Sequence, residues 1–349
     1  MQKINLGKLN KLIIHNIGNK GSADGVRFSD EMTNFESVEE IINKLIVSNF
    51  KFDELYQFHF LPHLDLNPVY SFVSSIFSDT EYENFIEHSK NVGRYLYDKS
   101  THPQIKSGEL CVFYMNDSSI DDEVTDCIGI FKSENKETVL KIEDKKTSYG
   151  LSDVSGINIH KLDKGCLIFN LEKEKGYLVA LVDNTNKNIE AQYWKDEFLS
   201  VKPQRNEYHQ TNEFLGITKQ FVTKQLDEDF DVSKADKIDF LNRSVDYFKK
   251  NETFDKQEFE EEVFGDSNVI ESFRKFDQTY RQENEVELAD SFEISAQAVK
   301  KQARVFKNVL KLDKNFHIYI HGNREMIEQG VDENGRKYRH IIGKATVTT

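Results

Sequence analysis

A group of polar and basic side chains recurs at helical spacing near the end of this 349-residue chain. Gln297, Lys300, Lys301, Arg304 and Lys307 each have a neighbour in the group three or four residues away. An α-helix gathers residues at such intervals on one side. Cations on one helix face suit contact with DNA phosphates. The same spacing also fits a solvated face of an amphipathic helix or a protein contact, so the alternatives stay open.

The segment Leu288–Arg304 carries the spacing of a helix-turn-helix motif, in which a second helix enters the DNA major groove. The small and apolar positions that the motif requires are Ala289, Ile294 and Val299. Ser295 is a favourable N-cap for the second helix. Glu293 departs from the pattern, because the turn usually prefers glycine and a carboxylate there repels phosphate. Helix-turn-helix docking is therefore one hypothesis, beside a solvated helix.

A second basic group lies in an expected C-terminal β-hairpin. Its two strands are joined by Asp332-Glu-Asn-Gly335, whose Asn-Gly pair favours a tight turn. The cations of this hairpin and the aromatic residue among them are Arg336, Lys337, Arg339, Lys344 and Tyr338. Cations beside an aromatic ring suit phosphate contact and base stacking. Charged hairpin surfaces also serve solubility alone.

The charge of the chain is distributed unevenly. Its net charge at pH 7 is −14, whereas residues 296–349 hold eleven Lys or Arg and five Asp or Glu and carry +6, which leaves −20 for the remainder. DNA affinity comes largely from phosphate neutralisation, so a local basic surface matters more than the total. The expected DNA contacts are Gln297, Lys300, Lys301, Arg304, Lys307, Arg336, Lys337 and Arg339.

A weaker pattern points to an enzyme. Asp126 and Glu143-Asp-Lys145 resemble the Asp…Glu-x-Lys arrangement of metal-dependent nucleases, where carboxylates hold Mg²⁺ and the lysine assists an attacking water. Glu-x-Lys is common by chance in a chain with 30% charged residues. Because no phosphate-binding loop, dinucleotide fingerprint or nucleophile elbow is present, we expect no enzyme, no cofactor and no metal.

Composition indicates a folded, soluble protein. The 38% hydrophobic and 12% aromatic content suffices for a packed core, and four Pro argue against long disordered linkers. No secretory signal and no run of about eighteen apolar residues is visible, so we expect a cytoplasmic protein without a membrane contact. The three cysteines, Cys111, Cys127 and Cys166, lie in apolar runs and are expected to be reduced and buried.

Periodicity predicts an N-terminal region of helices and an antiparallel β meander. Ser37-Val-Glu-Glu40 has the pattern of a capping box that opens an amphipathic helix. Further helices are expected after Asn67-Pro68 and from about Thr80 to Tyr97. From Glu109, short apolar runs between polar turns predict the meander. These runs are ELCVFYM, DCIGIFK, ETVLKIE, GINIHKL, CLIFNLE and GYLVALVD.

After Trp194 the pattern becomes helical as far as about Leu310. The predicted class is α+β, with an N-terminal mixed domain containing the meander and a helical middle and C-terminal region closed by a short β-hairpin. The expected domains are residues 1–202, mixed α+β; 203–312, helical; and 313–349, a β segment packing on the preceding regions. Pro203 and the polar run around Arg205 favour the first boundary.

The acidic helical region suggests an alternative function. Its phenylalanines are interpreted as an exposed surface on which a DNA-processing enzyme docks, the chain then acting as an adaptor. The residues of this expected surface are Phe254, Phe259, Phe264 and Phe273. The sequence leaves the oligomeric state open, self-association into a homo-oligomer being one option.

Long ordered segments of the chain resemble the bacterial NdpA-type nucleoid-associated protein family. They include KLIIHNIGNK, NPVYSFVSSIFSD, HPQIKSGELCVFYM, GINIHKLDKGCLIFN, KADKIDFLNRSVDYF and AVKKQARVFKNVLKLDKNFHIYIHG, and the resemblance spans Leu12 to Ile342. It implies location at the nucleoid, binding of double-stranded DNA with little sequence preference, and no established catalytic activity. It assigns no individual residue, so the expected DNA contacts rest on charge and spacing.

Overall fold

The computed structural model describes residues 3–79, 81–185, 193–305, 309–311, 317–319, 327–331 and 337–341. The chain forms two compact units, residues 1–204 and 205–349, here called the N-terminal and C-terminal units. The division into three domains at 202/203 and 312/313 stays a prediction.

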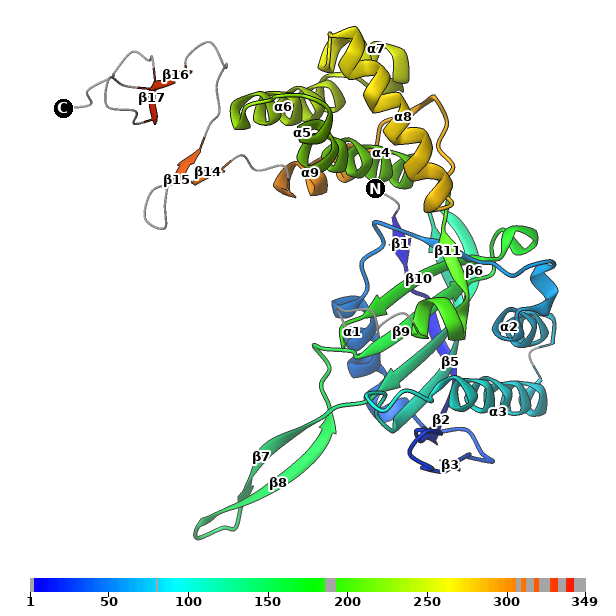
Figure 1. The fold of residues 1–349 in the computed structure, drawn as a ribbon. Helices are drawn as coiled ribbons and strands as arrows, with labels where there is room; N and C mark the ends of the chain where they lie inside the picture. Colours follow the sequence, from blue (N-terminus) through cyan, green and yellow to red (C-terminus); the bar gives the residue numbers. More distant parts are fainter. Residues whose placement is uncertain are drawn as a thin grey trace. The chain divides into compact units, whose positions relative to one another are not determined.

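The N-terminal unit contains a nine-stranded sheet, in which the order along the main path is β11-β4-β10-β9-β6-β5-β2-β3 and β1 pairs with β5 (Figure 1). All its strand pairs are antiparallel. The strands are β1 (Ile4–Asn5), β2 (Lys8–Ile17), β3 (Val26–Arg27), β4 (Tyr56–Phe58), β5 (Gly108–Ile120), β6 (Glu123–Ser133), β9 (Lys164–Phe169), β10 (Leu178–Asp183) and β11 (Val201–Pro203).

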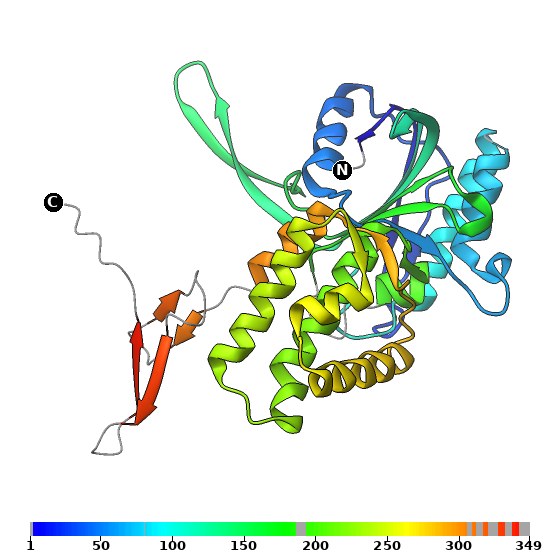
Figure 2. The same ribbon diagram turned by 90° about the horizontal axis from the view of Figure 1, so that it is seen from above.

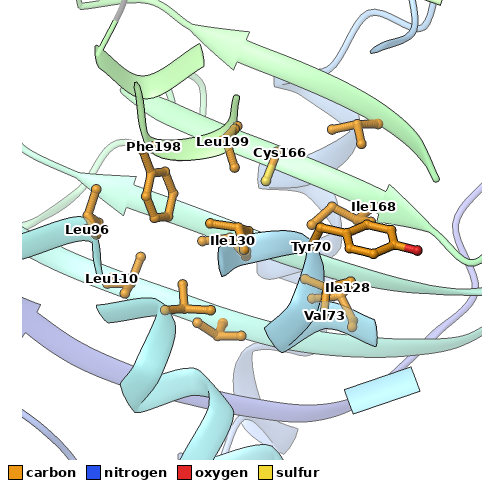
Figure 3. Packing of buried hydrophobic residues seen from close by; sticks show 14 of the residues in the cluster. Tyr70, Val73, Leu96, Leu110, Ile128, Ile130, Cys166, Ile168, Phe198 and Leu199 are labelled. Carbon is orange, nitrogen blue, oxygen red and sulfur yellow. The ribbon is translucent and has the colours of Figure 1, made fainter. Parts of the chain in front are cut away.

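Side chains of the central strands are buried on both faces, because each face has its own helical cover. On β5, Leu110, Val112 and Tyr114 point into one core, while Phe113 and Met115 point into the other. The first core lies under α2 (Pro68–Ser78), α3 (Tyr82–Lys99) and the π-helical segment η5 (Tyr193–Leu199), as Figure 3 shows. The second lies under α1 (Glu39–Asn49). This alternation is the period of two that a strand imposes.

The helices of this unit begin at different signals. Asn67 caps α2 by accepting a hydrogen bond from the Tyr70 N–H, and Pro68 occupies the first turn, as the sequence predicts. The predicted capping box at Ser37 is wrong. There the 3₁₀ turn η1 (Glu36–Val38) precedes α1, and Val38 stands at the cap without a side-chain bond. Within the described residues of this unit, the other 3₁₀ turns are η2 (Leu64–Leu66) and η3 (Lys173–Lys175).

Two of the runs predicted for the meander do not join the sheet: ETVLKIE lies in β7 (Lys136–Asp144), and GINIHKL shares only Gly156 and Ile157 with β8 (Tyr149–Ile157). β7 and β8 pair only with each other among the described residues and form a ribbon that extends beyond the sheet (Figures 1 and 2). Expecting them inside the meander was wrong. Strand β6 pairs directly with β9, so the sheet closes without them and their side chains stay exposed.

The C-terminal unit packs helices around an aromatic core. In its described residues the helices are α4 (Glu207–Gln220), the π-helical segment η6 (Phe221–Gln225), α5 (Leu226–Asp229), α6 (Lys234–Lys250), α7 (Lys256–Val263), α8 (Ser267–Glu283) and α9 (Ala296–Val305). A capping box between Ser233 and Asp236 opens α6. Strands β12 (Thr253–Asp255) and β13 (Ser291–Glu293) pair antiparallel beside these helices.

The phenylalanines of the acidic region lie inside this core. Phe254, Phe259 and Phe273 are fully buried, and Phe264 is 4% exposed. Their rings pack on Phe214 and on one another, with the Phe214 and Phe254 centroids 4.3 Å apart. The predicted exposed phenylalanine surface is therefore wrong, because these rings supply the apolar area that the helices bury.

The end of the chain contains short strand pairs. β14 (Val309–Lys311) pairs with β15 (His317–Tyr319), and β16 (Ile327–Val331) pairs antiparallel with β17 (Lys337–Ile341). The predicted hairpin is confirmed, although its turn lies outside the described residues. Together with the sheet and the helical unit, this confirms the α+β class. Within the described part of the chain, no helix is long and apolar enough to cross a membrane.

Candidate nucleic-acid interface

Helix α9 is anchored by its apolar side. Ala298 is fully buried and Val299 is 4% exposed. At the start of the helix, the Ser295 N–H donates to Thr211 Oγ1 on α4 at 3.0 Å, and the Ser295 hydroxyl accepts a longer bond from the Ala298 N–H at 3.4 Å. Further along, Gln302 Nε2 donates to Asn212 Oδ1 at 2.7 Å. These contacts fix which side of α9 faces solvent.

Two predicted cations lie on the solvent side of α9. Lys300 and Arg304 are exposed and four residues apart, so they are neighbours on the helix surface. Neither forms an ion pair within the described residues, where the ion pairs involve other cations. Arg304 lies in the last turn, where the helix dipole favours a positive charge. This pair presents uncompensated positive charge.

The other predicted residues of α9 are less free. Lys301 Nζ donates to the Tyr208 hydroxyl on α4 at 2.9 Å and lies 5.4 Å from the centre of that ring. Tyr208 is itself 3% exposed, so the lysine stem lies along a buried aromatic side chain. Gln297 is half-buried. The sequence gives no signal for the Lys301–Tyr208 contact, which joins residues 93 positions apart.

The remaining predicted contacts fall where side chains are not described. Lys307 and Arg336 lie outside the described residues. Lys337 and Arg339 belong to β17, where they pair with Val331 and Gln329 of β16. The structure thus brings four of the eight predicted residues together on one helix, while the place of the others relative to that helix stays a prediction.

The helix-turn-helix expectation is wrong. The motif places Ala289 in a first helix and Glu293 in the turn, but α8 ends at Glu283, and Ser291–Glu293 forms strand β13, which pairs with β12. Phe292 stacks on Phe254 with ring centroids 4.6 Å apart and is 7% exposed. Burying this ring fixes an extended backbone where the motif needs a helix and a turn.

The start of α9 is acidic. A hollow of about 550 Å³ lies there, and its charged lining residues are Lys249, Glu252 and Glu293. Glu293 and Thr253 are paired in register across β13 and β12. Two carboxylates against one ammonium give this end of the helix a charge that repels phosphate. The C-terminal half of α9 is therefore its better DNA-facing part.

Cations elsewhere in the helical unit are largely neutralised by ion pairs. Lys256 and Arg281 both bind the buried Asp277, at 2.6 and 2.7 Å. Arg274 binds the buried Glu260 at 2.7 Å. Residues 205–295 hold 12 Lys or Arg and 23 Asp or Glu, a net charge of −11. Positive charge in this unit is thus concentrated from α9 onward.

The nuclease residues are not brought together. Asp126, in β6, accepts hydrogen bonds from the Tyr114 hydroxyl at 2.6 Å and from Asn116 at 3.3 Å. Glu143 and Lys145 lie on the exposed ribbon, where the Ser152 hydroxyl donates to Glu143. Asp126 is seven residues before the end of β6, so strand and ribbon separate the three groups. Within the described residues, no three His, Cys, Asp or Glu side chains could hold a metal ion.

A buried charged network escaped the sequence analysis. Lys132 and Lys164 are both fully buried, and their ammonium groups bind Glu134 and Asp183 at 3.1 and 2.8 Å. Tyr193 donates to Glu134 at 2.9 Å, and its ring centre lies 5.9 and 5.1 Å from the two ammonium groups. Burial lowers the pKa of Lys132. Because these charges are enclosed and paired, the network fastens η5 to the sheet rather than offering a site.

In the described residues, α9 presents an exposed basic pair, and the predicted nuclease residues form no cluster. Comparison of the sequence with protein-family models identifies the class as nucleoid-associated protein. The chain belongs to the family described as nucleoid-associated protein YejK, whose model matches residues 13–336. No curated protein matches the chain. The resemblance to the NdpA type is confirmed, and membership gives the protein a nucleoid-associated role in a family that is not a known enzyme family.

Proposed function

We propose that this protein binds double-stranded DNA mainly through phosphates, with little sequence preference, along the exposed face of α9 and the basic segment that follows. The observation that carries the proposal is the uncompensated pair Lys300 and Arg304, at the point where the charge changes from −11 over residues 205–295 to +6 over residues 296–349. The proposed contacts are Gln297, Lys300, Lys301, Arg304, Lys307, Arg336, Lys337 and Arg339.

The proposed mode is phosphate contact rather than reading of bases. Cations fix a protein on the duplex without reading its sequence, and base readout needs an element that enters a groove. Because strand β13 precedes α9, the first helix that a helix-turn-helix motif uses to place its recognition helix is missing. The acidic hollow at the start of α9 repels phosphate, so phosphate is expected to approach the helix at Lys300 and Arg304 instead.

Fluorescence anisotropy with a random duplex across a salt series tests this proposal. The variant Lys300→Ala/Lys301→Ala/Arg304→Ala is expected to weaken binding at least about tenfold at low salt and to flatten the log K against log [salt] slope by about 2 to 3. The matched control is Lys224→Ala/Lys234→Ala/Lys275→Ala, which removes the same charge from exposed positions on other helices. The control is expected to bind like the unaltered protein.

Two outcomes would contradict the proposal. Absence of binding at low salt by the unaltered protein would remove direct DNA contact, and a pull-down that survives nuclease treatment would then point to a DNA-processing protein as partner. Equal loss of DNA binding in both triple variants would show that only total charge matters.

A separate assay tests for nuclease activity. Supercoiled plasmid incubated with the protein and Mg²⁺ or Mn²⁺ is expected to stay uncleaved, because Asp126 and Glu143 lie apart.

A further inference from the structure

The ribbon of β7 and β8 has two chemically different faces. Its register pairs Ile142 with Leu151 and Val139 with Val154, so the two pairs lie on opposite faces. The face of the first pair, here called face A, carries most of the bulky apolar residues. These residues and their exposed fractions are Leu140 70%, Ile142 69%, Tyr149 78%, Leu151 73% and Ile157 37%.

Face A is too apolar to be explained as ordinary surface. Leu140, Ile142, Tyr149 and Leu151 lie in adjacent rows, whereas Ile157 is separated from them by the Thr138–Ser155 row. These four side chains make an apolar patch on the order of a few hundred Å², the size at which exposed patches mark interaction sites. A two-stranded ribbon also gains little stability from its own pairing in water. Covering face A would therefore stabilise both the apolar side chains and the ribbon.

The charges of the ribbon argue against DNA as the occupant of face A. Residues 136–157 hold four Lys and four Asp or Glu, so the ribbon has no net attraction for phosphate. Lys136, the lysine of face A within the strands, is paired with Glu109 at 2.6 Å. Asp144 and Asp153 share that face and repel a phosphate backbone. A protein surface is the better occupant.

We propose that face A binds face A of a second copy of this chain, with the two ribbons antiparallel. A two-fold axis through the Ile142–Leu151 pair places these apolar residues at the centre of the contact. In the register, Tyr149 lies one row from this axis toward the tip of the ribbon, and Asp153 lies one row from it toward the sheet. The axis therefore brings each Tyr149 opposite Asp153 of the other copy. The phenol can donate to that carboxylate, so Asp153, one of the two acids of the face, gains a partner.

Sedimentation of the full chain tests this contact with two matched double variants. Ile142→Lys/Leu151→Glu changes the central pair of face A, and Val139→Lys/Val154→Glu changes a cross-strand pair of the other face. Each variant keeps the net charge and introduces opposite charges across the strands, which preserves ribbon pairing. The first is expected to raise the dissociation constant of the dimer roughly 100-fold, and the second to leave it unchanged.

Cysteine cross-linking gives a second readout. Leu151→Cys lies next to the proposed two-fold axis, and because sheets packed face to face are about 10 Å apart, a short bifunctional thiol reagent is expected to join two copies through it, whereas Val154→Cys is not expected to cross-link. Thermal unfolding of each variant checks that the fold is retained. A monomeric unaltered chain, or equal behaviour of the two double variants, would overturn the proposal. Loss of DNA binding by the face A variant with an intact dimer would instead assign the face to DNA.

Discussion

The aromatic core of the helical unit and the ribbon of the N-terminal unit are both rich in large apolar residues, yet they have opposite environments. Phe214, Phe254 and Phe259 are fully buried among helices distant in sequence. Leu140 and Leu151 are 70% and 73% exposed. The helices converge on one another from several directions, whereas each ribbon strand has only the other beside it. Apolar content thus does not decide burial; the number of neighbouring elements does.

The largest expected effect lies in the aromatic core. Phe259→Ala removes a fully buried ring that contacts Phe214 and Tyr247, with centroids 5.1 and 5.3 Å away. The free energy of unfolding of the C-terminal unit is expected to fall by about 3 to 5 kcal/mol, because the transfer energy is lost and a cavity remains. Urea unfolding followed by circular dichroism measures it. A loss below about 1 kcal/mol would mean that the core collapses around the gap.

A buried titratable group is expected to show the next largest effect. His15 is 1% exposed; its Nδ1 accepts from the Ser29 N–H at 3.1 Å, so its Nε2 donates to Ser89 Oγ at 3.0 Å. Burial, with smaller contributions from Lys90 and Arg94, lowers the pKa of His15 from 6.5 to about 4. The neutral ring is therefore the stable form in the folded protein.

Acid should consequently destabilise the N-terminal unit through His15. Between pH 6.5 and 4 the unfolded chain binds a proton that the folded chain does not, so stability rises with pH across this window. The expected loss on acidification is on the order of 2 kcal/mol. His15→Gln keeps an acceptor and a donor without titrating, and it should show a shallower pH dependence in urea unfolding. Identical slopes for both proteins would exclude this role for His15.

The smallest effect on stability is expected from the ribbon. Replacing residues 138–155 by Asn-Gly joins Glu137 to Gly156, which already pair across the strands and suit a two-residue turn. The sheet keeps its β6–β9 pairing, so we expect the melting temperature of the monomeric chain to change by no more than about 2 °C. Differential scanning calorimetry at low protein concentration measures it. A large decrease would show that the ribbon supports the sheet.

The sequence predicted those elements whose signals are local. Asn67-Pro68 gives a cap and a first-turn proline, and α2 begins there. The apolar runs from Glu109 became β5, β6, β9 and β10 of one antiparallel sheet. The chain's resemblance to its family was also readable from the sequence, because it rests on ordered segments over most of the length.

Other expectations failed because they depended on distant partners. Ser37-Val-Glu-Glu40 has the capping pattern, but the chain makes a 3₁₀ turn before α1. The helix-turn-helix spacing ignored Phe292, whose burial against Phe254 sets β13. Of the candidate DNA contacts, spacing alone placed Gln297, Lys300 and Arg304 on one helix, but it gave no sign that Lys301 is held by Tyr208.

By itself, the sequence determined the family, the α+β class, the positions of most helices and strands, and the concentration of positive charge after residue 295. The family follows from resemblance over long ordered segments, and the other features follow from local periodicity and composition, which need no knowledge of neighbours. Tertiary structure alone decided that the phenylalanines are core, that β7 and β8 leave the sheet, and that Lys132 and Lys164 are buried with carboxylates. Each of these depends on which remote element covers a side chain, and burial and ion pairing are properties of that contact.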